Sequence, residues 1–330
     1  MNKMPHIELN VNDLIGERLD KYISLKSSNK SRSKIKQLIL EKKVLVNGKP
    51  SEPDYKITLN DKILINNIET NTTKIVGENI KLNIVHEDNN LIVINKPSGL
   101  VVHPGAGNRT GTLVHAIVHH SNGELSDIGN NERPGIVHRI DKNTSGLIVV
   151  AKDNFTHMKL SKQFSDHTID REYVALVWGK VIPKKGKIES LLSRSNRNRK
   201  KMMSSNIKGK NAITHYKTIE TLQDTKGNTV ASLLLCKLET GRTHQIRVHL
   251  SENGNPIVGD KVYGRTPKNK TKYLHEQTIE IINSLDGQCL HAQTLGFIHP
   301  KTKKKHVYQC DIPKNLRNLI DSIKKQGIEK

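Results

Sequence analysis

The segment from Gly135 to Lys152, GIVHRIDKNTSGLIVVAK, constrains the fold of this chain more than any other stretch. Two apolar runs, residues 136–137 and 147–151, enclose a polar stretch made almost entirely of turn-forming residues. The pattern predicts two buried strands joined by a loop that carries Asp141. Catalytic groups commonly sit on polar loops held by a rigid scaffold, so Asp141 is a candidate. Taken alone, the segment favours a simpler interpretation, a surface turn whose aspartate is balanced by basic neighbours.

The chain is strongly basic. Its 330 residues include 54 Lys and Arg against 32 Asp and Glu, a formal net charge of +22. A surplus of this size predicts a polyanionic partner, with nucleic acid ahead of an anionic membrane surface. A lysine-rich codon bias is the alternative, but bias alone would not suppress acidic residues this far. The length suggests about two domains with room for a good core.

The cysteine and histidine patterns predict neither a metal site nor a secreted protein. The three cysteines are far apart and odd in number, as expected for reduced thiols in a cytoplasmic protein. His115 and His119 stand one turn apart on an expected helix, but no Glu follows the first and no third ligand is apparent, so we expect no metal. No secretory signal is visible, and no apolar run approaches the roughly 20 residues that span a bilayer.

Residues 13–65 read as a small unit with helices over 16–25 and 31–42, followed by short strands and an Asn-Gly turn at 47–48. The runs GERLDKYIS and SRSKIKQLILEKKVLVNGKP resemble the S4 RNA-binding domain. The resemblance implies an RNA-contacting helix start that includes Ser31, Arg32 and Lys34. A solvated basic face is an equally good interpretation of these residues. The polar, weakly patterned residues 66–80 are expected to form a linker.

From residue 81 onward short strands mix with helices without regular βαβ alternation, which predicts an α+β fold with a largely antiparallel sheet. We expect a hairpin around residues 89–90, helices over 111–120 and 243–250, a helix that includes residues 155–164, and strands over 171–181 and 231–238.

Residues 190–212 carry many basic side chains and no acidic ones, amid Ser and Asn. Such a composition cannot bury a core, so the segment is expected to be either a mobile arm that orders on RNA or a plain disordered loop. The candidate RNA-binding residues of this segment are Arg197, Arg199, Lys200 and Lys201.

Five ordered motifs in the second part of the chain resemble the RluA family of pseudouridine synthases. They are NKPSGLVVHPGAGN (95–108), HRIDKNTSGLIVVAK (138–152), REYVALVWG (171–179), GRTHQIRVHL (241–250) and GDKVYG (259–264). HPGAGN and the run CLHAQTLGFIHP (289–300) are most similar to the D type of the family, which acts on large-subunit ribosomal RNA. The resemblance implies a pseudouridine synthase catalytic domain over residues 81–330.

The resemblance also implies roles for individual residues. Asp141 matches the catalytic aspartate, Tyr173 the active-site tyrosine, and Arg247 the arginine that pairs with that aspartate. Arg139 stands where related enzymes use an arginine to fill the gap left by the displaced nucleotide. Ile140 replaces the usual Leu and Asn143 the usual Asp, and neither change removes the catalytic carboxylate.

The implied reaction converts uridine to pseudouridine without a redox step, group donor or metal, so no cofactor is expected. The implied partner is large-subunit ribosomal RNA or a pre-ribosomal particle, bound by a cytoplasmic monomer. Sequence spacing alone does not place Asp141, Tyr173 and Arg247 in one pocket, and each also has an ordinary structural interpretation. A protein of another class, a non-catalytic RNA-binding ribosome-assembly factor, is therefore the alternative.

Overall fold

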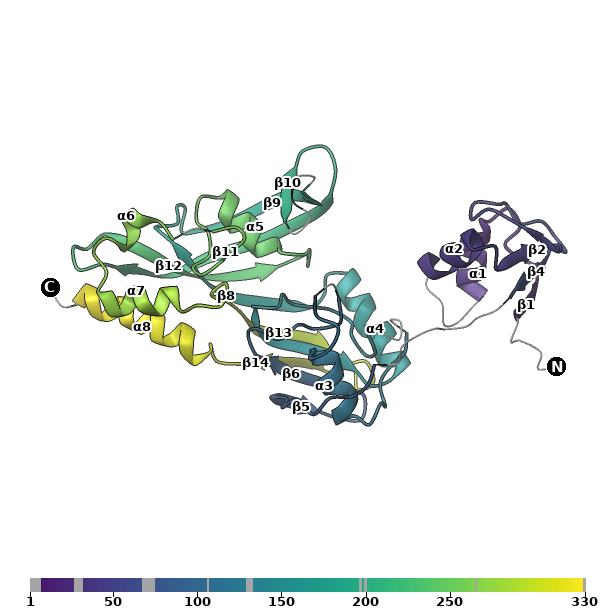
Figure 1. The fold of residues 1–330 in the computed structure, drawn as a ribbon, viewed down its shortest axis with the longest axis horizontal. Helices are drawn as coiled ribbons and strands as arrows, with labels where there is room; N and C mark the ends of the chain where they lie inside the picture. Colours follow the sequence, from purple (N-terminus) through teal and green to yellow (C-terminus); the bar gives the residue numbers. More distant parts are fainter. Residues whose placement is uncertain are drawn as a thin grey trace. The chain divides into compact units, whose positions relative to one another are not determined.

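The computed structural model describes residues 7–26, 32–66, 75–105, 107–128, 133–195, 198, 201–264 and 266–328. The chain divides into two compact units, the first made of Met1–Ile75 with Asp127–Pro134, and the second of Val76–Ser126 with Gly135–Lys330 (Figure 1). Each unit has its own hydrophobic core. Residues 67–74, which form most of the expected linker, lie outside the described residues.

The first unit packs two helices on a small antiparallel sheet. The helices are α1 (Leu19–Lys26) and α2 (Arg32–Leu40), and the strands β1 (Ile7–Asn10), β2 (Val44–Val46), β3 (Lys49–Pro50) and β4 (Lys62–Ile65) pair in the order β1-β4-β2-β3. The Asn-Gly turn is confirmed: Asn47 and Gly48 both have positive φ, 51° and 79°, as the tight hairpin between β2 and β3 requires. Both helices were predicted, although α1 begins at Leu19 rather than residue 16, whereas β1 was missed.

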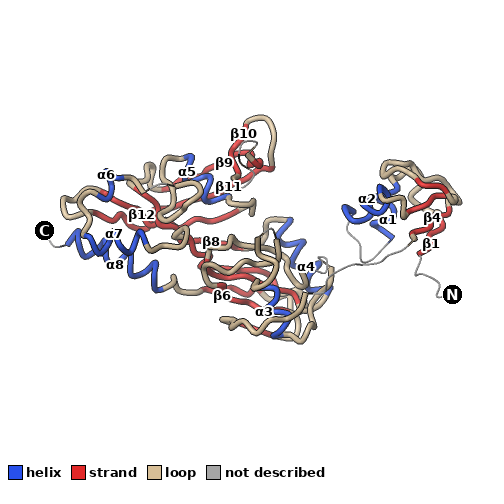
Figure 2. Tube along the Cα trace, in the orientation of Figure 1, coloured by secondary structure: helices blue, strands red, loops and turns tan. Residues whose placement is uncertain are grey.

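The second unit is built on one large sheet. Its strands are β5 (Ile84–Glu87), β6 (Leu91–Lys96), β7 (Ser145–Ala151), β8 (Asp170–Trp178), β9 (Lys185–Arg194), β10 (Met202–Ser205), β11 (Lys210–Gln223), β12 (Thr229–Leu238), β13 (Leu290–Ile298) and β14 (Lys305–Gln309). Its helices are α3 (Leu113–His120), α4 (Asn154–Ser165), α5 (Gln245–Glu252), α6 (Lys268–Thr271), α7 (Glu276–Asn283) and α8 (Lys314–Ile328). Figure 2 shows the strands of this unit in red and its helices in blue.

The order in this 10-stranded sheet is β10-β9-β11-β12-β8-β13-β7-β6-β5, with β14 added on β13. β13 and β7 run parallel, whereas the other strand pairings of the described residues are antiparallel. The predicted α+β fold with a largely antiparallel sheet is therefore confirmed.

Strands β6 and β7 are apolar on both faces because each face of this part of the sheet is covered by a helix. Alternate side chains of these strands pack with Leu160 of α4 on one side and with Leu113 and Ile117 of α3 on the other. Burial on both faces explains why Leu147 to Ala151 is a continuous apolar run rather than an alternating one. The doubly covered strands form a rigid base for the loop that precedes β7.

The expected strand at residues 136–137 is wrong. Ile136 makes one isolated bridge to Val150, and the chain then runs in irregular conformation to β7. The Val149 amide of β7 donates a 3.0 Å hydrogen bond to the ring nitrogen Nε2 of His138. A side chain thus accepts a hydrogen bond that the backbone of a neighbouring strand would otherwise accept. Asp141 therefore lies on a loop that has a strand on its C-terminal side alone.

The prediction for residues 190–212 is wrong for the described part of that segment. β9 extends to Arg194, β10 pairs with β9, and β11 begins at Lys210. Leu192, Ala212 and Met202 pack against Val248 of α5, so the segment does bury apolar side chains. Arg197, Arg199 and Lys200 lie outside the described residues.

Candidate active site

Asp141, Tyr173 and Arg247, which are far apart in the sequence, line one cavity of about 490 Å³. Asp141 comes from the loop before β7, Tyr173 from β8 and Arg247 from α5. The structure therefore brings together the three residues that the motifs single out. Ile140, beside Asp141, is 5% exposed and belongs to the same hydrophobic core as Tyr173, so the Leu-to-Ile difference leaves the loop anchored.

The register of the sheet aligns Tyr173 with the start of β7, which follows the Asp141 loop. Ala292 of β13 pairs with Tyr173 on one side and with Gly146 on the other. β13 therefore lies between the two strands, and the backbones of Gly146 and Tyr173 are two inter-strand steps, roughly 10 Å, apart. Gly146 is required for this approach, because a Cβ there would lie 2.2 Å from the Ala292 carbonyl oxygen.

A buried chain of charges holds the Asp141 carboxylate. Arg247 donates from Nη1 to Asp141 Oδ2 at 2.8 Å, and from Nε and Nη2 to the two oxygens of Asp260 at 2.7 and 3.0 Å. The side chains of Asp260, Arg247 and Asp141 are 0%, 6% and 19% exposed, so the chain leads from the interior to the cavity. The expected pairing of Asp141 with Arg247 is present.

The ionised form of this chain is favoured by its hydrogen bonds. Burial alone would raise the pKa of Asp260, but Arg247 and the backbone amides of Val262 and Tyr263 outweigh that effect and lower it. Burial likewise opposes the charge on Arg247, yet the two carboxylates raise its pKa. Both partners are therefore charged at neutral pH.

A second layer fixes the guanidinium from the side. The Tyr263 ring lies 5.0 Å from the Arg247 guanidinium carbon, and its hydroxyl is 2.7 Å from His244 Nδ1. Burial lowers the pKa of His244, so the imidazole is neutral at pH 7. Its Nε2 lies 3.9 Å from Asp141 Oδ1. A neutral ring next to the carboxylate leaves Arg247 as the cation that orients it.

Tyr173 and Arg139 line the same cavity from other directions. Tyr173 is 8% exposed, and burial raises the pKa of its hydroxyl, so the phenol is protonated at neutral pH. Arg139 is exposed, and its Nη1 lies 2.8 Å from His103 Nε2. The geometry thus gives a carboxylate, an aromatic ring and an exposed guanidinium around one space.

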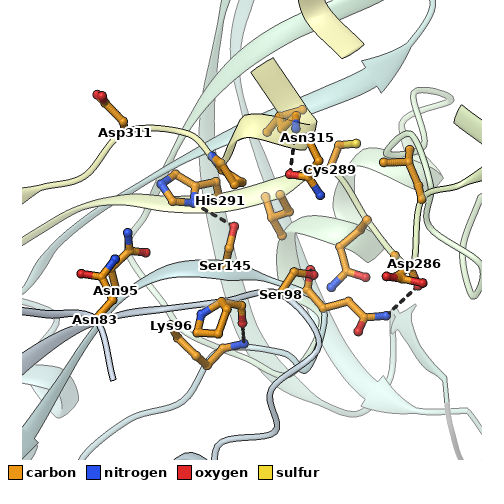
Figure 3. Close-up of a pocket in the computed structure, with 18 of the residues that line it drawn as sticks. Asn83, Asn95, Lys96, Ser98, Ser145, Asp286, Cys289, His291, Asp311 and Asn315 are labelled. Atoms are coloured by element: carbon orange, nitrogen blue, oxygen red, sulfur yellow. Dashed lines mark hydrogen bonds between the residues drawn. The ribbon is translucent and has the colours of Figure 1, made fainter. Parts of the chain in front are cut away.

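The loop that carries Asp141 is also held by residues that border a second, larger cavity of about 950 Å³ (Figure 3). Lys96 donates from Nζ to the Lys142 carbonyl at 2.9 Å, and Ser98 donates from Oγ to the Asn143 carbonyl at 3.0 Å. The Asn143 amide donates to the Asp286 carbonyl at 3.1 Å. An Asp at position 143 could not donate this bond, so the departure from the family pattern has a structural use here.

Comparisons with known proteins agree with this geometry. The family model for RNA pseudouridylate synthases matches residues 90–252. The chain is 42% identical over 312 residues to the ribosomal large subunit pseudouridine synthase D of Zymomonas mobilis, covering 93% of this chain and 94% of the relative. It is 38% identical over 311 residues to an uncharacterised RNA pseudouridine synthase of Bacillus subtilis, covering 94% and 95%. The chain belongs to the RNA pseudouridine synthase family.

Two further matches concern the fold of the synthase. The S4 domain model matches residues 17–63, in the first unit. The solved structure of human RNA pseudouridylate synthase domain containing 1 superposes with a TM-score of 0.56 at 23% identity, covering 74% of this chain and 89% of that one. This second likeness supports the pseudouridine synthase fold.

The structure describes the side chains of some of the predicted RNA-binding residues but not of others. Arg32 donates from Nε and Nη2 to the buried Asp20 at 3.1 and 3.2 Å, and so joins α2 to α1 while its side chain stays 51% exposed. Ser31 and the side chain of Lys34 lie outside the described residues. Lys201 is described, with its Nζ 5.9 Å from the centre of the Tyr263 ring.

Within the described ranges, no group of three or more His, Cys, Asp or Glu side chains is arranged to hold a metal ion. None of the helices in that part of the chain has the length and apolar character needed to cross a bilayer.

Asp260, Tyr263 and Lys96 were not predicted from the sequence as parts of the site. The first two belong to the GDKVYG motif and the third to NKPSG, so all three were within recognised motifs without an assigned role. An acid and an aromatic spaced three apart, directly after Gly259, were the available signal.

Proposed function

We propose that this synthase isomerises specific uridines of the large-subunit ribosomal RNA to pseudouridine, with Asp141 acting on a nucleotide flipped out of its helix. The observation that carries the proposal is the Asp141 carboxylate, oriented by Arg247 at 2.8 Å inside a cavity that also contains Tyr173. Relatives from Zymomonas mobilis and Neisseria meningitidis that match over more than 90% of this chain are named ribosomal large subunit pseudouridine synthase D, which supports the choice of RNA.

The chemistry needs few groups because the reaction is an isomerisation. The bond from C1′ to N1 breaks, the uracil turns, a bond from C1′ to C5 forms, and the hydrogen of C5 is replaced by one on N1. Asp141 acts either as a nucleophile on C1′ or as the base that starts an elimination at the sugar. In both routes a carboxylate beside the sugar is required, and Arg247 fixes the Asp141 carboxylate by a 2.8 Å hydrogen bond to Oδ2.

Tyr173 supports the base through its ring. The buried phenol offers a face on which uracil can stack while it turns, and its protonated hydroxyl is a hydrogen-bond donor at neutral pH. Because burial raises the pKa of this hydroxyl, we assign it the role of donor rather than that of a resting base.

The basic surface assists the step that precedes chemistry. A target base must leave its stack before Asp141 can reach the sugar, which costs a few kcal/mol that phosphate contacts can offset. The net charge of +22 and the S4 unit provide such contacts. We propose that it acts as a monomer, in the cytoplasm, on ribosomal RNA or a pre-ribosomal particle.

The catalytic part of the proposal is tested by Asp141→Asn, which removes the nucleophile while keeping the size of the side chain. RNA carrying tritium at C5 of uridine releases it to water when pseudouridine forms. We expect release to fall by at least a thousandfold with RNA affinity retained. Asp166→Asn is the matched control, because Asp166 is exposed, pairs with Lys162 and lies outside the cavity. Undiminished release from Asp141→Asn would refute the role of Asp141.

The choice of RNA is tested separately. Pseudouridine is mapped at single-nucleotide resolution on ribosomal RNA from cells with and without the synthase. We expect specific large-subunit positions to remain uridine when the synthase is absent. An unchanged large-subunit map, with changes in another RNA, would overturn the substrate while leaving the catalytic proposal intact.

A further inference from the structure

A buried arginine that the chemistry above does not use forms part of the active-site cavity. Arg171 is the second residue of β8 and is 7% exposed. Because side chains alternate along a strand, Arg171 and Tyr173 lie on the same face of β8. Both residues line the 490 Å³ cavity with Asp141. The guanidinium is therefore a neighbour of the space where the target nucleotide would lie.

Arg171 has no acidic partner among the residues that the structure describes. The acid before it, Asp170, lies on the opposite face of β8, where it pairs with Lys237 and Lys305. The guanidinium Nη2 donates to the Glu239 carbonyl at 3.2 Å, whereas the buried Nε has no described acceptor. A buried cation without an anion is costly, so a counter-charge is expected to arrive with a ligand.

The surroundings of Arg171 are shaped around its guanidinium. Gly241 provides the space, since a Cβ at that position would lie 2.3 Å from Arg171 Nη1. The Phe164 ring covers another side, with the guanidinium carbon 5.6 Å from the ring centre. Both neighbours also line the cavity. The arginine is held in place by packing rather than by an ion pair, which leaves its charge for a ligand.

The charge balance of the cavity indicates the kind of ligand. Arg247 is balanced by Asp260 and Asp141, and Asp141 is the acidic residue of the cavity lining. Arg139, Arg171 and Arg242 also line it, so the surplus there is positive. Burial lowers the pKa of Arg171, Tyr173 partly opposes this, and the neighbouring Arg242 adds to it, as two cations gathered for an anion would.

We propose that Arg171 is a phosphate-binding residue, and that it receives a backbone phosphate next to the target uridine when the nucleotide enters the cavity. Uracil and sugar carry no net charge, so the phosphodiester is the part of the substrate that can balance a buried guanidinium, and planar guanidinium groups match phosphate oxygens in pairs. Together with the ring of Tyr173 on the same strand face, this contact fixes the register of the nucleotide against Asp141. The inference rests on the proposed binding of the target nucleotide at Asp141.

The test combines a protein variant with a neutralised phosphate in the RNA. The substrate is the stem-loop that the synthase modifies, prepared with a single methylphosphonate, on a 2′-O-methyl sugar, at the phosphate on either side of the target or at remote positions. Arg171→Gln keeps a donor for the Glu239 carbonyl and removes the charge. Affinity for each RNA is measured for wild type and variant.

We expect Arg171→Gln to bind native RNA about tenfold more weakly. Neutralising one phosphate beside the target should weaken RNA binding by wild type by a similar factor, and RNA binding by the variant by much less. The slope of log K against log salt should fall by about 0.7, the release of roughly one counterion from a single strand. Additive losses at both flanking phosphates, or an unchanged salt slope, would overturn the proposal.

Two further variants keep the test decisive. Arg317→Gln on α8 is the matched control, because Arg317 is 52% exposed and pairs with Asp311 outside the cavity. It should show neither coupling nor a change in slope. If Arg171→Gln fails to fold, Arg171→Lys supplies the answer: it keeps the charge without the paired donors, and should retain the salt slope while losing affinity at the same phosphate. A reduced slope or unchanged affinity would count against the proposal. If the effects of Arg171→Gln and of the neutralised phosphate on RNA affinity are additive while tritium release stays normal, this inference alone is rejected.

Discussion

The replacement Asp260→Asn tests whether the buried charge chain holds the active site together. Asn has the size of Asp and keeps an oxygen that can accept from the backbone amides of Val262 and Tyr263. It removes the negative charge that faces Arg247 Nε and Nη2 at 2.7 and 3.0 Å. The change therefore removes the charge and, where Oδ2 accepted from Arg247 Nε, leaves an amide group that cannot accept a hydrogen bond.

The magnitude follows from the burial of the pair. Two unit charges about 4 Å apart attract by about 4 kcal/mol at an effective dielectric constant of 20. Removing one partner of a buried pair costs about 3–5 kcal/mol, because the other charge stays behind without compensation. Arg247 would keep Asp141 at 2.8 Å, so we place the loss at the lower end, about 3 kcal/mol.

Urea unfolding measures this loss, and the single tryptophan makes it specific. Trp178 is 3% exposed on β8, so its fluorescence reports on the second unit. We expect Asp260→Asn to be less stable than the double variant Arg247→Met, Asp260→Asn, in which the more deeply buried pair is removed together and the carboxylate that loses its partner is Asp141, which is 19% exposed. The difference in free energy of unfolding between wild type and Asp260→Asn should have its full value above about pH 4. It should shrink as the pH falls through the lowered pKa of Asp260, since protonation removes the same charge. A single variant as stable as wild type, or a double variant that is the least stable, would refute this reasoning.

Three other predictions concern Lys96, His138 and the basic segment. Lys96→Met removes the bonds from Nζ to the carbonyls of Pro97, Leu100 and Lys142, so we expect a loss of about 2–3 kcal/mol by urea unfolding and a fall in kcat larger than the fall in RNA affinity. Burial lowers the pKa of His138 to about 3, so its neutral ring contributes stability that is lost as the pH falls below 6.5. Because the ring is partly open to the cavity, we expect wild type to lose about 1–2 kcal/mol between pH 7.5 and pH 5 that His138→Gln does not lose, and equal losses would contradict this. The last prediction replaces four residues of the basic segment by Ala: Arg197, Arg199, Lys200 and Lys201. We expect RNA binding to weaken and its salt dependence to flatten. An unchanged salt slope would mean that the segment does not contact RNA.

Local pattern was sufficient for much of the fold and for one residue of the site. The helical spacing of α2 and α3, the hairpin between β5 and β6, and the turn at Asn47 are all written in short stretches of sequence. The loop position of Asp141 also followed from its turn-forming neighbours. Its proximity to Tyr173 did not, because β13 joins the sheet between β7 and β8 from more than 100 residues further along the chain. Motif resemblance supplied what local pattern lacked.

The basic segment shows why composition alone misled. Residues 190–212 lack acids and contain few apolar side chains, which is typical of disorder. Two of the few apolar residues are nevertheless buried, because β9 and β11 place Leu192 and Ala212 against Val248. Val248 belongs to α5, whose position depends on the rest of the sheet. The ordered structure of residues 190–212 thus depends on packing against α5, which lies outside this stretch of sequence.

Arg247 is shared between two carboxylates, and this sharing decides which Asp141 oxygen it binds. A guanidinium that met Asp141 through two nitrogens would bind both of its oxygens. Here Asp260 takes the Nε and Nη2 side of Arg247, so Asp141 receives Nη1 alone, through Oδ2. Oδ1 faces a neutral His244 at 3.9 Å, beyond hydrogen-bond distance. In the proposed mechanism, the buried acid therefore leaves one oxygen of Asp141 available to the sugar, and Asp260→Asn should impair kcat even where the protein remains folded.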